Sequence, residues 1–132
     1  MKSDLDVAKT LILKADNDLK TAQIGIEHDG PLDAVAFHVQ HAAEKLLKAL
    51  LASRGVAYPL THDLRALLNL AVNEIPELES FRERLLPLNP YAVEIRYDHS
   101  VNPDSEEITS ALSTVEELRN AILDNIPDEA RS

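Results

Sequence analysis

One stretch of the chain, FHVQHAAEKLLK at residues 37–48, places polar side chains of ligand-binding or catalytic type in an otherwise apolar pattern. At 100° per residue these side chains share one arc of a helix, and apolar residues fill roughly 200° on the other side. Such a group could ligate a metal, transfer protons, bind an anion or form the solvated side of a long helix. The polar residues are His38, His41, Glu44, Lys45 and Lys48.

The spacing of these residues separates the alternatives. His38 and His41 stand at i and i+3, close enough to share a metal ion. Glu44, however, lies about 120° from His38 around the helix, and no other segment carries a matched ligand motif such as HExxH. We therefore predict no metal site and no cofactor. The histidines either lie on a solvated face or bind an anionic or polar ligand beside Lys45 and Lys48.

The apolar side of the same stretch is also unusual. Gln40 lies inside the apolar arc, so its amide must find partners there or cost about 1–3 kcal/mol. The arc is wider than one core face needs, and Phe37 lies among the polar residues. A second buried surface, such as a dimer interface, would explain both features.

A second dense group of functional side chains is YAVEIRYDH at residues 91–99. If this segment is helical, Arg96 and His99 share a face and could act together on one phosphodiester. Arg96 would then hold the phosphate through two hydrogen bonds, and His99 would serve as general base or acid. In the alternative, Arg96 pairs with Glu94 or Asp98 and the tyrosines pack as half-buried residues.

Composition limits the classes of protein that this chain can form. The 132 residues are 45% apolar and 4% aromatic and contain no cysteine, which predicts one helical domain over residues 1–132 without disulfides. The net charge of −10 argues against a general nucleic-acid coat, and we expect no DNA binding. Residues 37–97 carry seven acidic and seven basic side chains, so a local anion site remains compatible with this segment. The absence of a long apolar run or signal-like N-terminus predicts a cytoplasmic protein without membrane contact.

Apolar residues at spacings of three and four predict an all-α, up-and-down antiparallel bundle of four to five helices. Thr61 is the expected N-cap of the third helix, and Pro103 the expected first residue of the last one. Residues 127–132 are expected to form a frayed tail. The predicted helices are a first one that ends at the Asp29-Gly30-Pro31 turn, and others at about 33–55, 62–73, 77–86 and 103–126.

Three sequence blocks together resemble the HEPN domain family. FHVQHAAEKLLKALLASRG is close to that family's FHxQQAxEKxLKAxL pattern, YPLTHDL to its THDL, and YAVEIRY to its yAxxxRY. The blocks occur in the family's order, and the resemblance extends over residues 11–118. It implies a HEPN-like bundle of four or five antiparallel helices, usually a homodimer with a cleft between the subunits.

The resemblance also implies a partner and a chemistry. Such proteins are often paired with a minimal nucleotidyltransferase in systems of the toxin–antitoxin type, and the partner can modify a tyrosine near this motif, here Tyr97. Many are metal-independent ribonucleases with an R-x4–6-H motif, whereas others bind nucleotides or are non-catalytic partners. In this chain no arginine is followed by histidine after four to six residues, and Arg96 and His99 have only two residues between them.

We therefore predict the HEPN component of such a pair, a dimer whose cleft binds a nucleotide or RNA phosphate. The alternatives are an endoribonuclease toxin that uses Arg96 and His99, and a non-catalytic helical interaction module. The candidate ligand-binding residues are His38, His41, Lys45, Lys48, His62, Asp63 and Tyr97.

Overall fold

The computed structural model describes residues 3–93 and 103–131, and the elements within them are helical. This confirms the predicted all-α helical bundle. The long helices are α1 (Asp4–Glu27), α2 (Leu32–Ser53) and α5 (Ser105–Leu123). The shorter elements are α3 (Leu64–Glu74), the 3-10 helix η1 (Pro76–Phe81), α4 (Arg82–Leu85), the 3-10 helix η2 (Leu86–Tyr91) and α6 (Asp128–Arg131).

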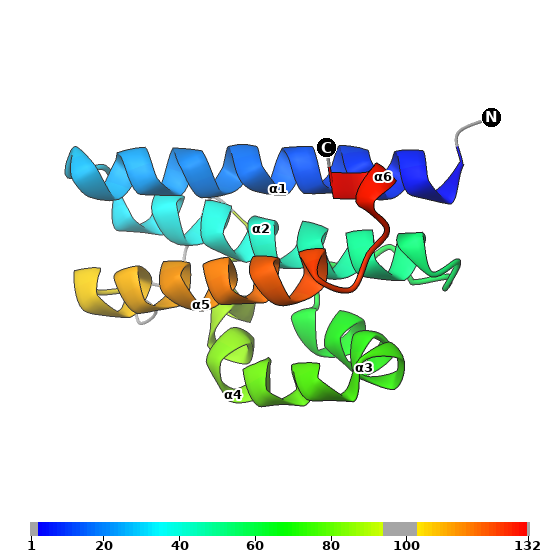
Figure 1. Cartoon of the computed structure of the whole chain (residues 1–132). Helices are drawn as coiled ribbons and strands as arrows, with labels where there is room; N and C mark the ends of the chain where they lie inside the picture. The colour runs from blue at the N-terminus through cyan, green and yellow to red at the C-terminus, as the bar shows by residue number, and fades with distance from the viewer. Residues whose placement is uncertain (1–2, 94–102, 132) are drawn as a thin grey trace.

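The three long helices lie side by side, with α2 in contact with α1, α3, α5 and η2 (Figure 1). α1 and α2 are antiparallel, and the segment from α3 to η2 returns the chain so that α5 runs in the same direction as α2 (Figure 1). The buried apolar side chains form one cluster that includes residues from α1, α2, α3 and α5. Packing within the chain thus accounts for the wide apolar arc of α2, which needs no dimer interface to explain it. None of the described helices is both long and apolar enough to cross a membrane.

Local sequence features account for the start of α1, for its close approach to α2 and for the end of α2. Ser3 and Asp6 form a capping box at the start of α1, in which each side chain accepts a hydrogen bond from the other residue's backbone N–H. Gly25 allows α1 and α2 to approach closely, because a Cβ at this position would lie 2.6 Å from Cγ2 of Val35. Gly55, with φ of +68°, adopts the left-handed conformation that follows many helices. α2 itself ends two residues earlier, at Ser53.

The start of α3 differs from the prediction. Its N-cap is Asp63, whose side chain accepts from the backbone N–H of Arg65, and not Thr61. The hydroxyl of Thr61 instead accepts from the Asp63 N–H, which forms a turn before the helix. The side chain of Asn89 accepts from the Leu64 N–H and donates to Asp63, so two distant segments share one cap.

The predicted helix at 77–86 is divided into η1, α4 and η2. Pro76 and Pro87 lie near the starts of the two 3-10 helices, and proline cannot donate the backbone hydrogen bond that a continuous α-helix needs. Leu78, Phe81 and Leu85 are nevertheless buried, as their spacing predicted.

The last helices also depart from the prediction. α5 has Asp104 as its N-cap, so Pro103 precedes the cap instead of opening the helix. The predicted frayed tail at 127–132 is wrong, because residues 128–131 form α6, which packs against α1 (Figure 1). Ala130 is fully buried there, and the Arg131 guanidinium donates to the carbonyl oxygen of Ile126.

Candidate functional site on helix α2

The polar residues of α2 divide into two groups that point to different neighbours. The first group meets α1 at Asp18, which is only 8% exposed. Nδ1 of His38 donates to one carboxylate oxygen of Asp18 over 2.9 Å, and Nζ of Lys45 donates to the other over 2.6 Å. Because Asp18 accepts from both side chains, this half of α2 is tied to α1 through His38 and Lys45.

The second group is centred on Glu44, which is 4% exposed. Burial alone would raise the pKa of Glu44, but hydrogen bonds from Lys48 and His62 outweigh it and hold the pKa below its ordinary value. Nζ of Lys48 lies 2.8 Å from Oε1, and Nδ1 of His62 lies 3.0 Å from Oε2. The chain thus keeps an ionised carboxylate in a nearly closed environment.

His41 lies between Phe37 and His62. The centroid of its ring lies 4.1 Å from that of Phe37, with the two planes tilted by 34°, and 5.5 Å from that of His62. Its Nε2 is 2.9 Å from the carbonyl oxygen of Ala92, the residue that follows η2. Since a carbonyl can only accept, Nε2 of His41 carries the hydrogen in this contact. Phe37 is therefore half-buried against a histidine and not isolated on a wet face.

Gln40 positions the segment that carries His62. This glutamine is fully buried, and its Nε2 donates to the backbone carbonyl of His62 over 2.9 Å. Its Oε1 is buried without a hydrogen-bond partner among the residues that the structure describes. The amide of Gln40 was predicted to need partners in the apolar arc, and among the described residues it has one for its nitrogen but none for its oxygen.

An open hollow lies beside this second group. We call it the His62 hollow. Arg65 lines this hollow, and no ion pair joins Arg65 to any residue in 3–93 or 103–131. The side chain of His62 is 62% exposed there. Its lining residues are Thr61, His62, Asp63, Arg65, Asn89 and Ala92.

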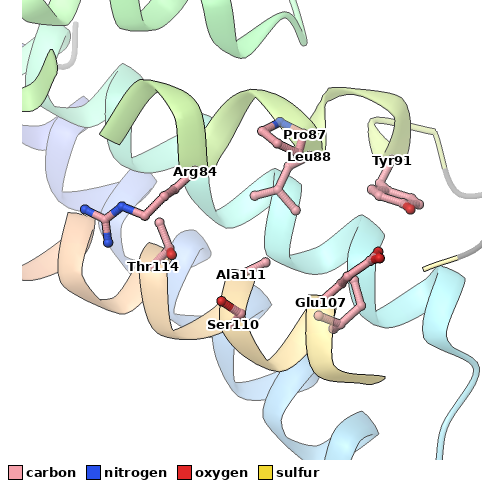
Figure 2. Close-up of a pocket in the computed structure, with 9 residues that line it drawn as sticks. Arg84, Pro87, Leu88, Tyr91, Glu107, Ser110, Ala111 and Thr114 are labelled. Carbon is pink, nitrogen blue, oxygen red and sulfur yellow. The ribbon is translucent and has the colours of Figure 1, made fainter. Parts of the chain in front are cut away.

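A second groove, of about 270 Å³, lies between the α4–η2 segment and α5 (Figure 2). Its lining is mainly apolar, and it shares no lining residue with the His62 hollow. Its one basic side chain, Arg84, is paired with Glu117 of α5 at 2.6 Å. The groove therefore has fewer groups available for an anion than the His62 hollow has.

The structure brings together part of the predicted site. Lys48 and His62 bind the carboxylate of Glu44, a ring nitrogen of His41 lies within 4.8 Å of it, and Asp63 lies in the adjoining hollow. His38 and Lys45 face Asp18 instead. The remaining predicted residues, Arg96, Tyr97 and His99, lie outside the described residues.

Three contributors were not predicted: Asp18, Arg65 and Asn89. Asp18 had a detectable signal, because this acid falls at helical spacing among the apolar residues Ala15 and Ala22 of α1. Arg65 and Asn89 had none, since their roles depend on contacts between segments far apart in the chain.

A comparison with protein families decides the relationship that the sequence blocks suggested. The model of the HEPN domain matches residues 8–126, which is most of the chain. The chain belongs to the HEPN domain family. Searches of curated proteins and of solved structures gave no match. The α2 residues discussed above, the His62 hollow and both 3-10 helices all lie within the matched HEPN segment.

Proposed function

We propose that this HEPN domain binds the phosphate of a nucleotide or RNA in the His62 hollow. The observation that carries the proposal is the difference in ion pairing between Arg65 and the other arginines of the described segments. Arg65 is exposed at the hollow and free of ion pairs with residues 3–93 and 103–131. The others each pair with an acidic side chain: Arg54, Arg82, Arg84, Arg119 and Arg131.

The chemistry of the hollow fits a phosphate ligand. A guanidinium can hold two phosphate oxygens through parallel hydrogen bonds. The Nδ1 hydrogen of His62 is used by Glu44, so the exposed imidazole donates a third bond from Nε2 only when the ring carries both hydrogens. The first amides of α3 are already used, since the Leu64 N–H donates to Asn89 and the Arg65 N–H donates to Asp63. Phosphate would therefore be bound by side chains and not by the end of the helix.

The wider role follows from membership of the family and remains part of the proposal. In this role the protein acts in the cytoplasm as a homodimer, with the phosphate bound in the cleft between subunits. Its partner is a minimal nucleotidyltransferase, in a pair of the toxin–antitoxin type. Because the R-x4–6-H motif is absent, we expect RNA to be bound without being cleaved.

The test is a binding measurement on two matched variants. Fluorescence anisotropy with labelled single-stranded RNA, and competition by ATP, would be compared for the wild type, Arg65→Ala and Arg82→Ala. Both variants lose one positive charge, but Arg82 pairs with Glu79 away from the hollow. We expect only Arg65→Ala to weaken binding, by about tenfold, and to reduce the salt dependence by about one charge. Equal affinities of the two variants would contradict the proposal.

Two further measurements test the assembly. Sedimentation equilibrium of the purified chain should give the mass of a dimer, and a nucleotidyltransferase encoded beside it should co-purify on co-expression. A monomer that neither binds this partner nor any nucleotide would remove the basis for the wider role.

A further inference from the structure

Three side chains of metal-binding type converge at the second group of α2. One ligand atom from each of His41, Glu44 and His62 lies within 4.8 Å of the other two. His41 and Glu44 stand at i and i+3 on α2, and His62 comes from the connection before α3. Two imidazoles and one carboxylate form a common set of zinc ligands, with water as a fourth. We propose that these three residues bind a divalent transition-metal ion such as Zn²⁺.

The Glu44–His62 contact is suited to accept an ion. The ammonium group of Lys48 engages Oε1 of Glu44 and not Oε2. Oε2 lies 3.0 Å from Nδ1 of His62, with a hydrogen between them. A metal ion would take the place of that hydrogen, which would leave as a proton to solvent.

His41 is prepared in the manner usual for a metal ligand. Because Nε2 donates its hydrogen to the Ala92 carbonyl, Nδ1 carries the free lone pair of the neutral ring. Histidines that bind metals commonly donate their second N–H to a carbonyl or carboxylate, which fixes both the tautomer and the orientation. Contact with Phe37 at 4.1 Å further restricts the ring.

The arrangement needs one adjustment to close around an ion. Ligands of a tetrahedral zinc site are about 3.4 Å apart when the bonds are about 2.1 Å long. Glu44 is held by burial and by Lys48, and His41 is held by its hydrogen bond to Ala92, whereas the His62 side chain is 62% exposed and has room to rotate. His62 is therefore the ligand that would move.

This proposal departs from the prediction that the chain has no metal site. That prediction rested on the spacing within α2, where no third ligand follows His38 and His41 on the same face. The third ligand instead comes from His62, 18 residues after Glu44, and only the fold shows that the two meet. The inference goes beyond phosphate binding, since the ion is proposed to bind with no nucleotide or RNA present.

The experiment is a calorimetric titration of ZnCl₂ into the full chain, free of a histidine tag and treated with EDTA before dialysis. We expect saturable binding of one ion per chain. His62→Gln and His41→Gln should each weaken binding by about tenfold or more, because loss of even an outer-shell partner commonly costs that much. Lys48→Gln should tighten binding at least about twofold, because it removes a positive charge beside the carboxylate.

His28→Gln is the matched control, because His28 is an exposed histidine beyond the end of α1. It should bind Zn²⁺ as the wild type does, and circular dichroism should show that every variant remains helical. Absence of saturable binding, or equal affinities of His28→Gln and His62→Gln, would overturn the proposal. Weaker binding by Lys48→Gln would also overturn it. None of these results depends on nucleotide or RNA binding, which Arg65→Ala tests separately.

Discussion

Asp18 of α1 and Lys45 of α2 form an ion pair of 2.6 Å across the interface between the two longest helices. The same carboxylate accepts a hydrogen bond from His38, so one acidic residue serves two polar groups of α2. Its position on an otherwise apolar face of α1 indicates a structural role in the register of the two helices.

Replacing Asp18 by alanine should destabilise the chain by about 1–3 kcal/mol, because Lys45 and His38 would lose their shared acceptor in a partly buried site. Urea unfolding at neutral pH measures this loss as a lower midpoint with an unchanged slope. Asp124→Asn, at an exposed acid without an ion pair among residues 3–93 and 103–131, should change stability by less than about 0.5 kcal/mol. Equal effects of the two changes would contradict the assigned role.

Because of Glu44, the free energy of unfolding should depend on pH in the acidic range. The pKa of Glu44 in the folded chain is lower than the ordinary 4.5, so the carboxylate contributes stability that is present above pH 4.5. This contribution is lost as the pH falls through the folded-state pKa. The difference in unfolding free energy between wild type and Glu44→Gln should therefore narrow below pH 4.5. Urea titrations from neutral to acid pH test this, and a constant difference would show that the charge has no such effect.

Gly25 should be required by the close approach of α1 to α2. A methyl group at this position would clash with Val35, so Gly25→Ala should cost about 1–3 kcal/mol. In a double-mutant cycle, the cost of Gly25→Ala should be smaller when Val35 is replaced by alanine, because the opposing methyl groups are then absent. Additive effects in that cycle would mean that the destabilisation has another origin.

Asn89 should stabilise α3 although it lies 25 residues from the helix start. It accepts from the Leu64 N–H and donates to Asp63, so Asn89→Ala should cost about 1 kcal/mol. Asn89→Asp keeps the acceptor but places a second carboxylate beside Asp63. We expect it to be at least as destabilising as Asn89→Ala. Thermal unfolding measures both, and a stable Asn89→Asp variant would argue against the contact with Asp63.

The long helices were predictable because their periodic apolar residues face one core and their ends carry local signals. The Asp29-Gly30-Pro31 turn and Gly55 mark the ends of α1 and α2 closely. Thr61 and Asp63 show the limit of such signals, because both residue types cap helices well. The residue that caps α3, Asp63, accepts a hydrogen bond from Asn89, which belongs to another segment and gives no local signal.

The site was less predictable than the fold for the same reason. Helical spacing identified the polar residues of α2 and places Lys48 one turn after Glu44, but it could not show that Glu44 would be buried or that His62 would reach it. It also could not show that Asp18 would take His38 and Lys45. His62 and Asp18 come from outside α2, so their distances to the α2 residues depend on how the segments pack.

The central position of α2 has a consequence for detecting a ligand. Residues such as Leu46 and Leu50 are fully buried on the same helix that carries His41 and Glu44. Their amide hydrogens should exchange with solvent only when the whole chain unfolds. A ligand bound to the folded form lowers the population of that unfolded state. A ligand bound at the surface of α2 should therefore slow deuterium uptake at buried amides throughout the core, including those that it does not contact.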